Sequence, residues 1–151
     1  MVQILYEDSE CAVLDEGEES EWFKVKTGVK QEDVMSGFIF LIVVDWIMKH
    51  ATEGNNTGIR WKFMTKLEDL DFADDIALLS STIQHMQDKA TKLCEFAART
   101  GLKINTKKTE VLRINSKSNT RIVLAGQQLN EVEKYTYLGA NVSNQGGGEK
   151  T

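Results

Sequence analysis

Five acidic residues fall within eight positions near the middle of the chain, and the last two, Asp74 and Asp75, are adjacent. Short apolar runs flank this pair, and no lysine or arginine occurs between Lys66 and Lys89. Carboxylates this close repel one another, so each raises the proton affinity of its neighbours. The apolar flanks argue against simple open solvent. The pattern therefore favours a hairpin that points Asp74 and Asp75 at a divalent metal ion.

Carboxylates held on a rigid strand-turn-strand suit two-metal phosphoryl transfer. In such sites neighbouring carboxylates hold two Mg²⁺ ions roughly 3.5–4 Å apart, one activating the attacking hydroxyl and the other steadying the leaving oxygens. Mg²⁺ prefers oxygen ligands and keeps several waters, so few protein carboxylates are needed. Aspartate is also a common turn residue, and for the dipeptide taken alone a plain polar turn is the commoner outcome.

The elements that must position the acidic pair can be predicted from residue patterning. The hairpin strands are expected at residues 67–73 and 76–79, followed by an amphipathic helix at 82–100. Ser81 and Gln84 form a capping box at its start, and Gly101 is placed to end it. A second helix is expected at 36–50, apolar nearly all round and so deeply buried, with Ser36 as its N-cap.

The rest of the chain reads as strands and turns. A hairpin with a glycine turn is expected at 11–25, and a half-buried strand at 59–63. After Gly101 the pattern predicts strands at 102–104 and 110–114, a hairpin at 122–129 and a last strand segment at 135–142. The fold class is α+β, in which a small antiparallel sheet carries the acidic hairpin and packs against two main helices.

Composition narrows the function only moderately. The chain has 151 residues and a net charge of −5, which argues against a free-standing nucleic-acid binder without excluding a local basic groove. Cys11 and Cys94 make neither a disulfide framework nor a metal motif. No signal peptide is visible, and the longest apolar run, 37–44, is too short to span a bilayer. We expect an intracellular protein, nuclear or cytoplasmic, with no membrane partner.

Four sequence motifs together resemble one known family. Phe-Ala-Asp-Asp at 72–75, followed by an apolar run, resembles motif C of reverse transcriptases. Residues 27–36 resemble the motif B loop, residues 101–109 resemble motif D, and Tyr-Leu-Gly at 137–139 resembles motif E. Their order and spacing are similar to the palm of non-LTR retrotransposon polymerases of the endonuclease–reverse transcriptase type. The resemblance covers roughly residues 1–148.

The resemblance implies a role for each matched position. Asp74 corresponds to the aspartate that binds both catalytic metals, and Asp75 to the second, less metal-committed aspartate, with Mg²⁺ or Mn²⁺ as cofactor. Gln31 would lie near the incoming nucleotide and template, and Lys108 near the triphosphate. RNA template, DNA primer and dNTP are the implied partners. The primer end would be steadied by motif E, Tyr137, Leu138 and Gly139.

The chain also departs from the family pattern. In motif B, Glu32 stands where a glycine is expected, Asp33 follows it, and Gly37 replaces a proline. Added acids beside a nucleotide's phosphates would be repulsive. The motif A aspartate is expected upstream of residue 1, as are the fingers, and most of the thumb and any endonuclease region are also missing. We therefore expect a partial palm domain at 1–144, motifs B to E, inactive alone, and a disordered glycine-rich tail at 145–151.

Two other interpretations stay open on the sequence. The chain could be a non-catalytic retrotransposon remnant that acts at most as a nucleic-acid or protein binding module. It could also be an unrelated metal-dependent phosphoryl-transfer domain, although that leaves the order of the motifs unexplained. Taken singly, Lys108 is typical of a solvated surface lysine and Gln31 of a loop side chain that faces water.

Overall fold

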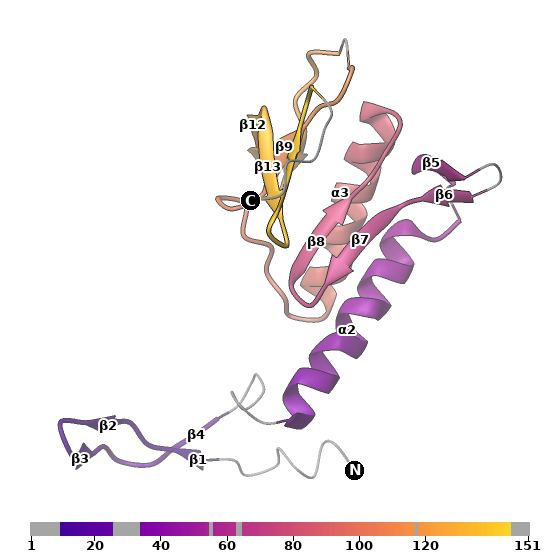
Figure 1. Ribbon diagram of the computed structural model, residues 1–151. Coiled ribbons are helices and arrows are strands. Elements are labelled where there is room, and N and C mark those ends of the chain that lie inside the picture. Colours follow the sequence, from indigo (N-terminus) through magenta and orange to yellow (C-terminus); the bar gives the residue numbers. More distant parts are fainter. Residues whose placement is uncertain (1–9, 26–33, 55, 63–64, 117, 146–151) are drawn as a thin grey trace. The chain divides into compact units, whose positions relative to one another are not determined.

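The computed structural model describes residues 10–25, 34–54, 56–62, 65–116 and 118–145, which fall into two units, Met1–Phe40 and Leu41–Thr151. Figure 1 follows the chain by colour through both units. The boundary between the units falls within a helix. The Asp74–Asp75 pair, Phe72, which pairs with Asp75, and Tyr137, which donates to the Asp75 carbonyl, belong to the second unit.

The described part of the first unit contains the hairpin predicted at 11–25. Its turn consists of Glu16 and Gly17, with φ of 47° and 90°, values that match the right-handed twist of paired strands. Ser20 fastens the two arms, because its N–H donates to the Val13 carbonyl (2.9 Å) and its hydroxyl accepts from the Val13 N–H (2.9 Å). The strands are β1 (Glu10–Cys11), β2 (Leu14–Asp15), β3 (Glu18–Glu19) and β4 (Phe23–Lys24).

Helix α2 (Val34–Thr52) is longer than the 36–50 predicted and starts earlier. Ser36 is therefore not the N-cap but a buried residue inside the first turns. The expectation of burial all round is also wrong within the second unit. Ile47 and Ala51 are buried, whereas Leu41 and Ile42 are about half exposed, so one face of α2 packs inward.

Helix α2 has the length and apolar composition to cross a membrane, which the apolar run at 37–44 alone did not suggest. Core helices pass the same test of length and composition. Asp45 lies in the middle of the stretch, and a charge there is costly in lipid. Buried Val44, Ile47 and Met48 show that part of the helix packs against protein.

Helix α3 (Ile83–Arg99) is close to the range that its apolar periodicity predicts. The N-cap is Thr82, not Ser81, and its hydroxyl accepts from the His85 N–H (3.3 Å). Its end is as predicted. Gly101 has φ of 80°, its N–H donates to Ala98, and the Leu102 N–H donates to Ala97, which is the left-handed termination that glycine favours.

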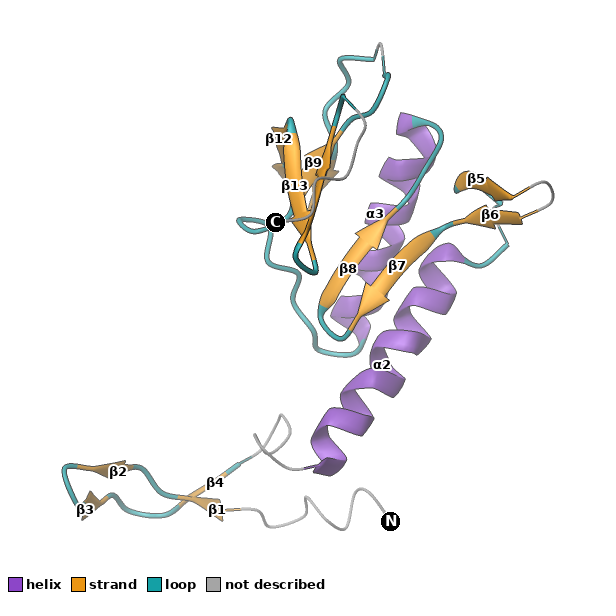
Figure 2. Ribbon diagram, viewed as in Figure 1, coloured by secondary structure: helices purple, strands orange, loops and turns teal. Residues whose placement is uncertain are grey.

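The strands of the second unit confirm an α+β fold built from short pairs around two helices, as Figure 2 shows. Within the described residues each strand has one partner, and all pairs are antiparallel except β9 with β12. The strands are β5 (Ile59–Lys62), β6 (Thr65–Leu67), β7 (Asp69–Phe72), β8 (Asp75–Leu78), β9 (Glu110–Leu112), β10 (Val123–Leu124), β11 (Gln127–Gln128), β12 (Asn130–Val132), β13 (Lys134–Tyr137) and β14 (Ala140–Ser143).

Three strand predictions need correction. Residues 102–104 form no strand, because Asn105 organises a turn there instead. Residues 135–142 are a hairpin, not one strand segment, since Leu138 and Gly139 have φ of 48° and 79° and reverse the chain. Strand β5 is exposed at all four residues, so the alternation at 59–63 did not mark a half-buried strand.

The core lies between α3 and the β10–β11 hairpin, whose Ala125–Gly126 turn was predicted. Gln87 joins the two elements as a backbone would, because its amide donates to the Val123 carbonyl (2.8 Å) and accepts from the Val123 N–H (2.9 Å). Burial of apolar side chains supplies most of the stability here. The buried residues of this cluster are Ala90, Ile122, Leu124 and Leu129.

Candidate functional site

The acidic pair lies at the end of the β7–β8 hairpin. Phe72 pairs with Asp75, so Ala73 and Asp74 make a two-residue turn. We call residues 72–75 the Asp turn. Ala73 has φ of 55°, a left-handed conformation that costs an L-residue roughly 1–2 kcal/mol. Both carboxylates are on exposed residues. The turn thus exposes two adjacent carboxylates to solvent, and its backbone is strained at Ala73.

The five clustered acids do not share one environment. Asp71, Asp74 and Asp75 are exposed, whereas Glu68 and Asp69 are half-buried. Glu68 precedes β7 and lies at the opposite end of the hairpin from the Asp turn. The expected repulsion is therefore relieved in two ways, by solvent at one end and by a cation from the protein itself at the other.

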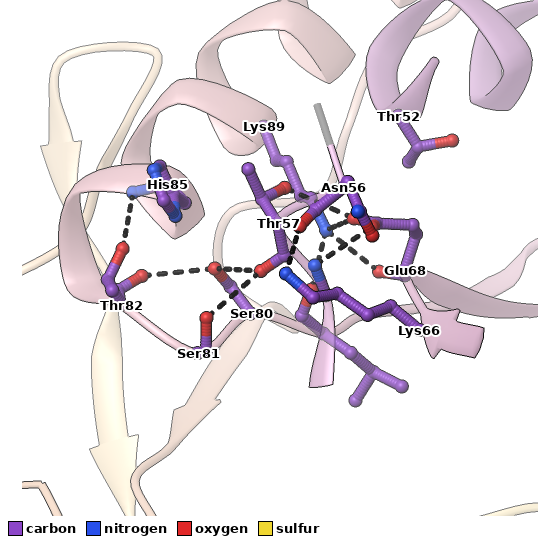
Figure 3. Close-up of polar contacts among 12 residues, drawn as sticks. Thr52, Asn56, Thr57, Lys66, Glu68, Ser80, Ser81, Thr82, His85 and Lys89 are labelled. Carbon is purple, nitrogen blue, oxygen red and sulfur yellow. Dashed lines mark hydrogen bonds and ion pairs between the residues drawn. The ribbon is translucent and has the colours of Figure 1, made fainter. Parts of the chain in front are cut away.

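That cation is Lys89, a buried residue of α3 whose ammonium group has three acceptors (Figure 3). It forms an ion pair with the Glu68 carboxylate, and it donates to the carbonyls of Glu68 (3.2 Å) and Leu79 (2.6 Å). The Leu79 N–H in turn donates to the Glu68 carbonyl (2.8 Å). We call Glu68, Leu79 and Lys89 the hairpin root.

The two residues before β5, Thr57 and Gly58, also bind the root. Glu68 accepts from the Gly58 N–H (2.8 Å) and from the Thr57 hydroxyl (3.1 Å), and the Ser81 N–H donates to the Thr57 carbonyl (3.2 Å). Gly58 is required here, because a Cβ at this position would lie 2.1 Å from the Leu67 carbonyl oxygen. Two segments distant in sequence, residues 57–58 and α3, therefore converge on the Glu68 carboxylate.

Electrostatics at the root and along β7 shift two pKa values in opposite directions. Burial by itself would raise the pKa of Glu68, but hydrogen bonds from Lys89, Gly58 and Thr57 and the lysine charge outweigh it, so this pKa is lowered. Burial, followed by the negative charge of Asp71, raises the pKa of Asp69. The root therefore favours an ionised Glu68, whereas the strand disfavours charge on Asp69.

Motif E reaches the Asp turn through one hydrogen bond. The Tyr137 hydroxyl, at the end of β13, donates to the Asp75 carbonyl (3.3 Å) across 62 positions in sequence. Burial, and then the charges of Asp71 and Asp75, raise the pKa of Tyr137. The next residue, Leu138, is exposed in the β13–β14 turn with Gly139. Tyr137 and the aspartate pair, matched separately in sequence, are thus neighbours in the fold.

Motif D is ordered locally and forms no hydrogen bond or ion pair with the Asp turn among the described residues. The Asn105 side-chain oxygen accepts from the N–H groups of Lys107 (3.2 Å) and Lys108 (3.3 Å), and its carbonyl accepts from the Thr109 N–H (3.0 Å). These bonds shape a turn on which Lys108 is exposed. Its ammonium group is available to an anion.

Most of motif B lies outside the part of the chain that the structure describes. Gln31, Glu32 and Asp33 lie outside the described residues. Of the departures from the family pattern, only Gly37 is described, and it lies within α2.

The Asp turn fits a hard divalent cation as part of a ligand set. Carboxylate oxygens are the ligands that Mg²⁺ and Mn²⁺ prefer, and both side chains are exposed to an incoming ion. Across the described ranges, no three histidine, cysteine, aspartate or glutamate side chains gather closely enough to hold a metal ion. Asp74 and Asp75 can therefore contribute at most part of a ligand set.

Sequence reasoning missed Lys89 entirely. Its spacing carried the signal, since it stands three residues after Met86 and four before Leu93, on the apolar stripe of α3. A lysine at such a position is rarely buried without a partner. The acidic run that precedes the helix contains the partner, Glu68.

Comparison with known proteins points in one direction. The family described as "Reverse transcriptase (RNA-dependent DNA polymerase)" matches residues 2–142. The "Retrovirus-related Pol polyprotein from type-2 retrotransposable element R2DM" of Drosophila melanogaster is 27% identical over 93% of this chain. The "Putative uncharacterized transposon-derived protein F52C9.6" of Caenorhabditis elegans is 32% identical over 51% of it. The aligned regions span 14% and 29% of those two relatives.

Proposed function

Because this chain belongs to the reverse transcriptase family, we propose that its Asp turn is the metal-binding hairpin of a polymerase palm. In this proposal residues 1–144 are one partial domain carrying motifs B to E. Asp74 and Asp75 would help to hold two divalent cations, Mg²⁺ or Mn²⁺. In two-metal nucleotidyl transfer one such ion would activate the primer hydroxyl and the other would steady the leaving pyrophosphate. The partners would be an RNA template, a DNA primer and a dNTP inside the cell.

The observation that supports this proposal most is the hydrogen bond from Tyr137 to Asp75. The residues proposed to hold the primer and the metal would have to act on the same reacting atoms, so they must be adjacent. A chance pair of motif matches carries no such requirement. Exposure of Leu138 at the tip of the second hairpin leaves an apolar surface beside the aspartates on which a primer sugar could rest.

Lys108 and Gln31 have separate proposed roles. The Asn105 turn presents Lys108 as a fixed positive charge, which suits a triphosphate. Gln31, by the match to motif B alone, would contact the nucleotide or template.

We further propose that the chain does not complete nucleotidyl transfer by itself. Two exposed carboxylates on one turn are a partial ligand set, and the acids Glu32 and Asp33 would repel the phosphates of a bound nucleotide. The chain would then act as one part of a larger polymerase site.

A direct test of the metal proposal is to titrate the chain with Mn²⁺ and follow the free ion by electron paramagnetic resonance. We expect saturable binding that Asp74→Asn weakens at least tenfold. Asp45→Asn, at an exposed aspartate of α2, should leave the affinity unchanged. Equal affinity in the wild type and Asp74→Asn would contradict the proposal.

A primer-extension assay on an RNA template tests the catalytic limit. We expect no extension by the purified chain with Mg²⁺ or Mn²⁺. Extension that Asp74→Ala abolishes would show that the chain is a complete catalyst. If neither the wild type nor Asp74→Asn binds Mn²⁺ and the wild type extends no primer, the chain would be a non-catalytic remnant.

A further inference from the structure

The hairpin that carries the Asp turn is a structurally isolated pair of strands. Within the described residues β7 pairs only with β8, and β8 only with β7. An isolated two-stranded hairpin is marginally stable and sets no orientation by itself. Its direction therefore depends on contacts with the rest of the second unit. The polar ones include the root, where α3 meets the strand ends, a side-chain hydrogen bond between Asp69 of β7 and Thr52 of α2, and the bond from Tyr137.

Lys89 is the residue through which α3 joins both strands at the root. Its ammonium donates to the carbonyl of Glu68, before β7, and to that of Leu79, after β8. The ion pair with the Glu68 carboxylate uses the third donor. Only the ion pair neutralises the Glu68 carboxylate. The other two bonds of the ammonium group connect α3 to the backbone at the end of each strand.

The apolar surroundings of Lys89 raise the free-energy cost of burying its charge. Ala90 and Leu93 are buried beside Lys89, and its own side chain is 1% exposed. A buried ion pair of this kind is often no more stable than a well-packed apolar pair of similar volume. Stability alone therefore does not account for Lys89, whereas a geometric role does.

The length of the hairpin converts a small error at the root into a large one at the Asp turn. Four residue steps separate the Glu68–Leu79 pair from the Phe72–Asp75 pair. At about 3.3 Å per residue this is roughly 13 Å, so a tilt of about 5° moves the carboxylates by about 1 Å. Displacements of that size in a catalytic site can cost on the order of 100-fold in rate.

We infer that Lys89 is a positioning residue, which fixes the direction in which the hairpin leaves α3 and so places the carboxylates of Asp74 and Asp75. The inference deepens the proposed function and rests on it, since the carboxylates need accurate placement only if they bind the cation. Lys89 acts through Glu68 and Leu79 and touches no reacting group itself.

The test compares Lys89→Met with the neutral double variant Glu68→Gln/Lys89→Met in the full-length chain. Lys92→Met, three residues further along α3, is the control because it makes none of the root contacts. Hairpin orientation relative to α3 is measured by residual dipolar couplings of the β7 and β8 amides, and Mn²⁺ affinity by titration. Thermal unfolding reports stability.

We expect both root variants to change the β7 and β8 couplings while those of α3 remain as in the wild type. Mn²⁺ binding should weaken by about 10- to 100-fold, as when groups that orient metal ligands are removed. The double variant should recover stability relative to Lys89→Met without recovering the couplings or the affinity. Lys92→Met should resemble the wild type in every measurement.

A double variant that restores stability, couplings and affinity together would overturn the inference, because Lys89 would then only balance charge. If the β7 and β8 couplings of the double variant equal those of the wild type, the positioning role of Lys89 is also overturned. The double variant alone gives this test if Lys89→Met does not fold. If the wild type binds no Mn²⁺, the proposed function fails separately. Changed β7 and β8 couplings would still support the positioning role of Lys89.

Discussion

The two ends of the β7–β8 hairpin treat acidic residues in opposite ways. At the root, Glu68 is half-buried, accepts hydrogen bonds from the adjacent residues Thr57 and Gly58, and is ion-paired with Lys89. At the Asp turn, Asp74 and Asp75 are exposed. Their nearest described polar contact, from Tyr137, reaches the Asp75 backbone and not a carboxylate. One end supplies its own cation, and the other leaves its charge available.

This contrast separates structure from function within one acidic run. A carboxylate that is ion-paired and hydrogen-bonded within the protein holds segments together and has less capacity left for a ligand. A pair left unsatisfied on a strained turn costs stability and is available to bind a cation. The hairpin therefore joins a stabilising end to a functional one, and substitutions at each end should have different consequences.

The largest effect on stability should come from breaking the root. Lys89→Met leaves the Glu68 carboxylate without its cation and removes the ammonium donor of the Leu79 carbonyl. Removing one partner of a buried pair costs about 3–5 kcal/mol. Urea unfolding measures this loss, with Lys92→Met as the control. A loss below about 1 kcal/mol would mean that water replaces the ammonium, and that the root is not the rigid end of the hairpin.

The root should also make stability depend on acid. The pKa of Glu68 is lower in the folded chain than its usual value, so its contribution is present above the usual glutamate pKa. It should be lost as pH falls through the lowered value. Glu68→Gln should flatten this part of the pH profile, and an unchanged profile would contradict the ion pair.

A smaller loss of stability should follow from adding a side chain at residue 58, which lies against the root. In Gly58→Ala the new methyl would meet backbone atoms of Leu67 and Glu68, and forcing them apart costs about 1–3 kcal/mol. Gly37→Ala is the matched control, because space around Gly37 is open and it lies within α2. That substitution should stabilise the helix by about 0.5–1 kcal/mol, so the two variants should differ in sign.

Tyr137→Phe should have a still smaller effect on stability. It removes one hydrogen bond to the Asp75 carbonyl while keeping the ring, which costs about 0.5–1.5 kcal/mol. Tyr135→Phe, on the same strand, removes a hydroxyl without such a bond among the described residues. Faster hydrogen exchange at the Asp turn amides in Tyr137→Phe alone would support the link between the two hairpins. Equal exchange in both variants would argue against it.

The smallest effect should be a gain. The pKa of Asp69 is raised in the folded chain, so its charged form is penalised at neutral pH, and Asp69→Asn should stabilise by less than about 1 kcal/mol. The gain should decline as pH falls through the raised pKa and be gone below the usual aspartate pKa, because Asp69 is then protonated in both the folded and the unfolded chain. A gain that persists in acid would have another cause.

Local sequence patterns predicted much of this fold. The apolar period of α3, the glycine after its end and the two-residue turn at Ala125–Gly126 each depend on neighbouring residues alone. The Asp74–Asp75 hairpin was predicted for the same reason. Motif order also predicted the family.

Features that depend on tertiary contacts were harder to predict. The N-cap moved from Ser81 to Thr82, because Ser81 bonds instead to the Thr57 carbonyl. The acidic cluster could not be divided into root and turn without knowing that α3 returns beside it. Lys89 was visible only as an exception to an apolar stripe, and its partner lies 21 positions away.

The contrast between the two ends can be tested in one spectrum. Substoichiometric Mn²⁺ is added to isotopically labelled chain, and paramagnetic broadening of each amide signal is recorded. We predict selective broadening at Ala73, Asp74 and Asp75, with Glu68 and Leu79 retained and the effect abolished in Asp74→Asn. Broadening centred on Glu68 or on the acidic first hairpin, or broadening that survives Asp74→Asn, would contradict the assignment of the Asp turn as the metal-binding end.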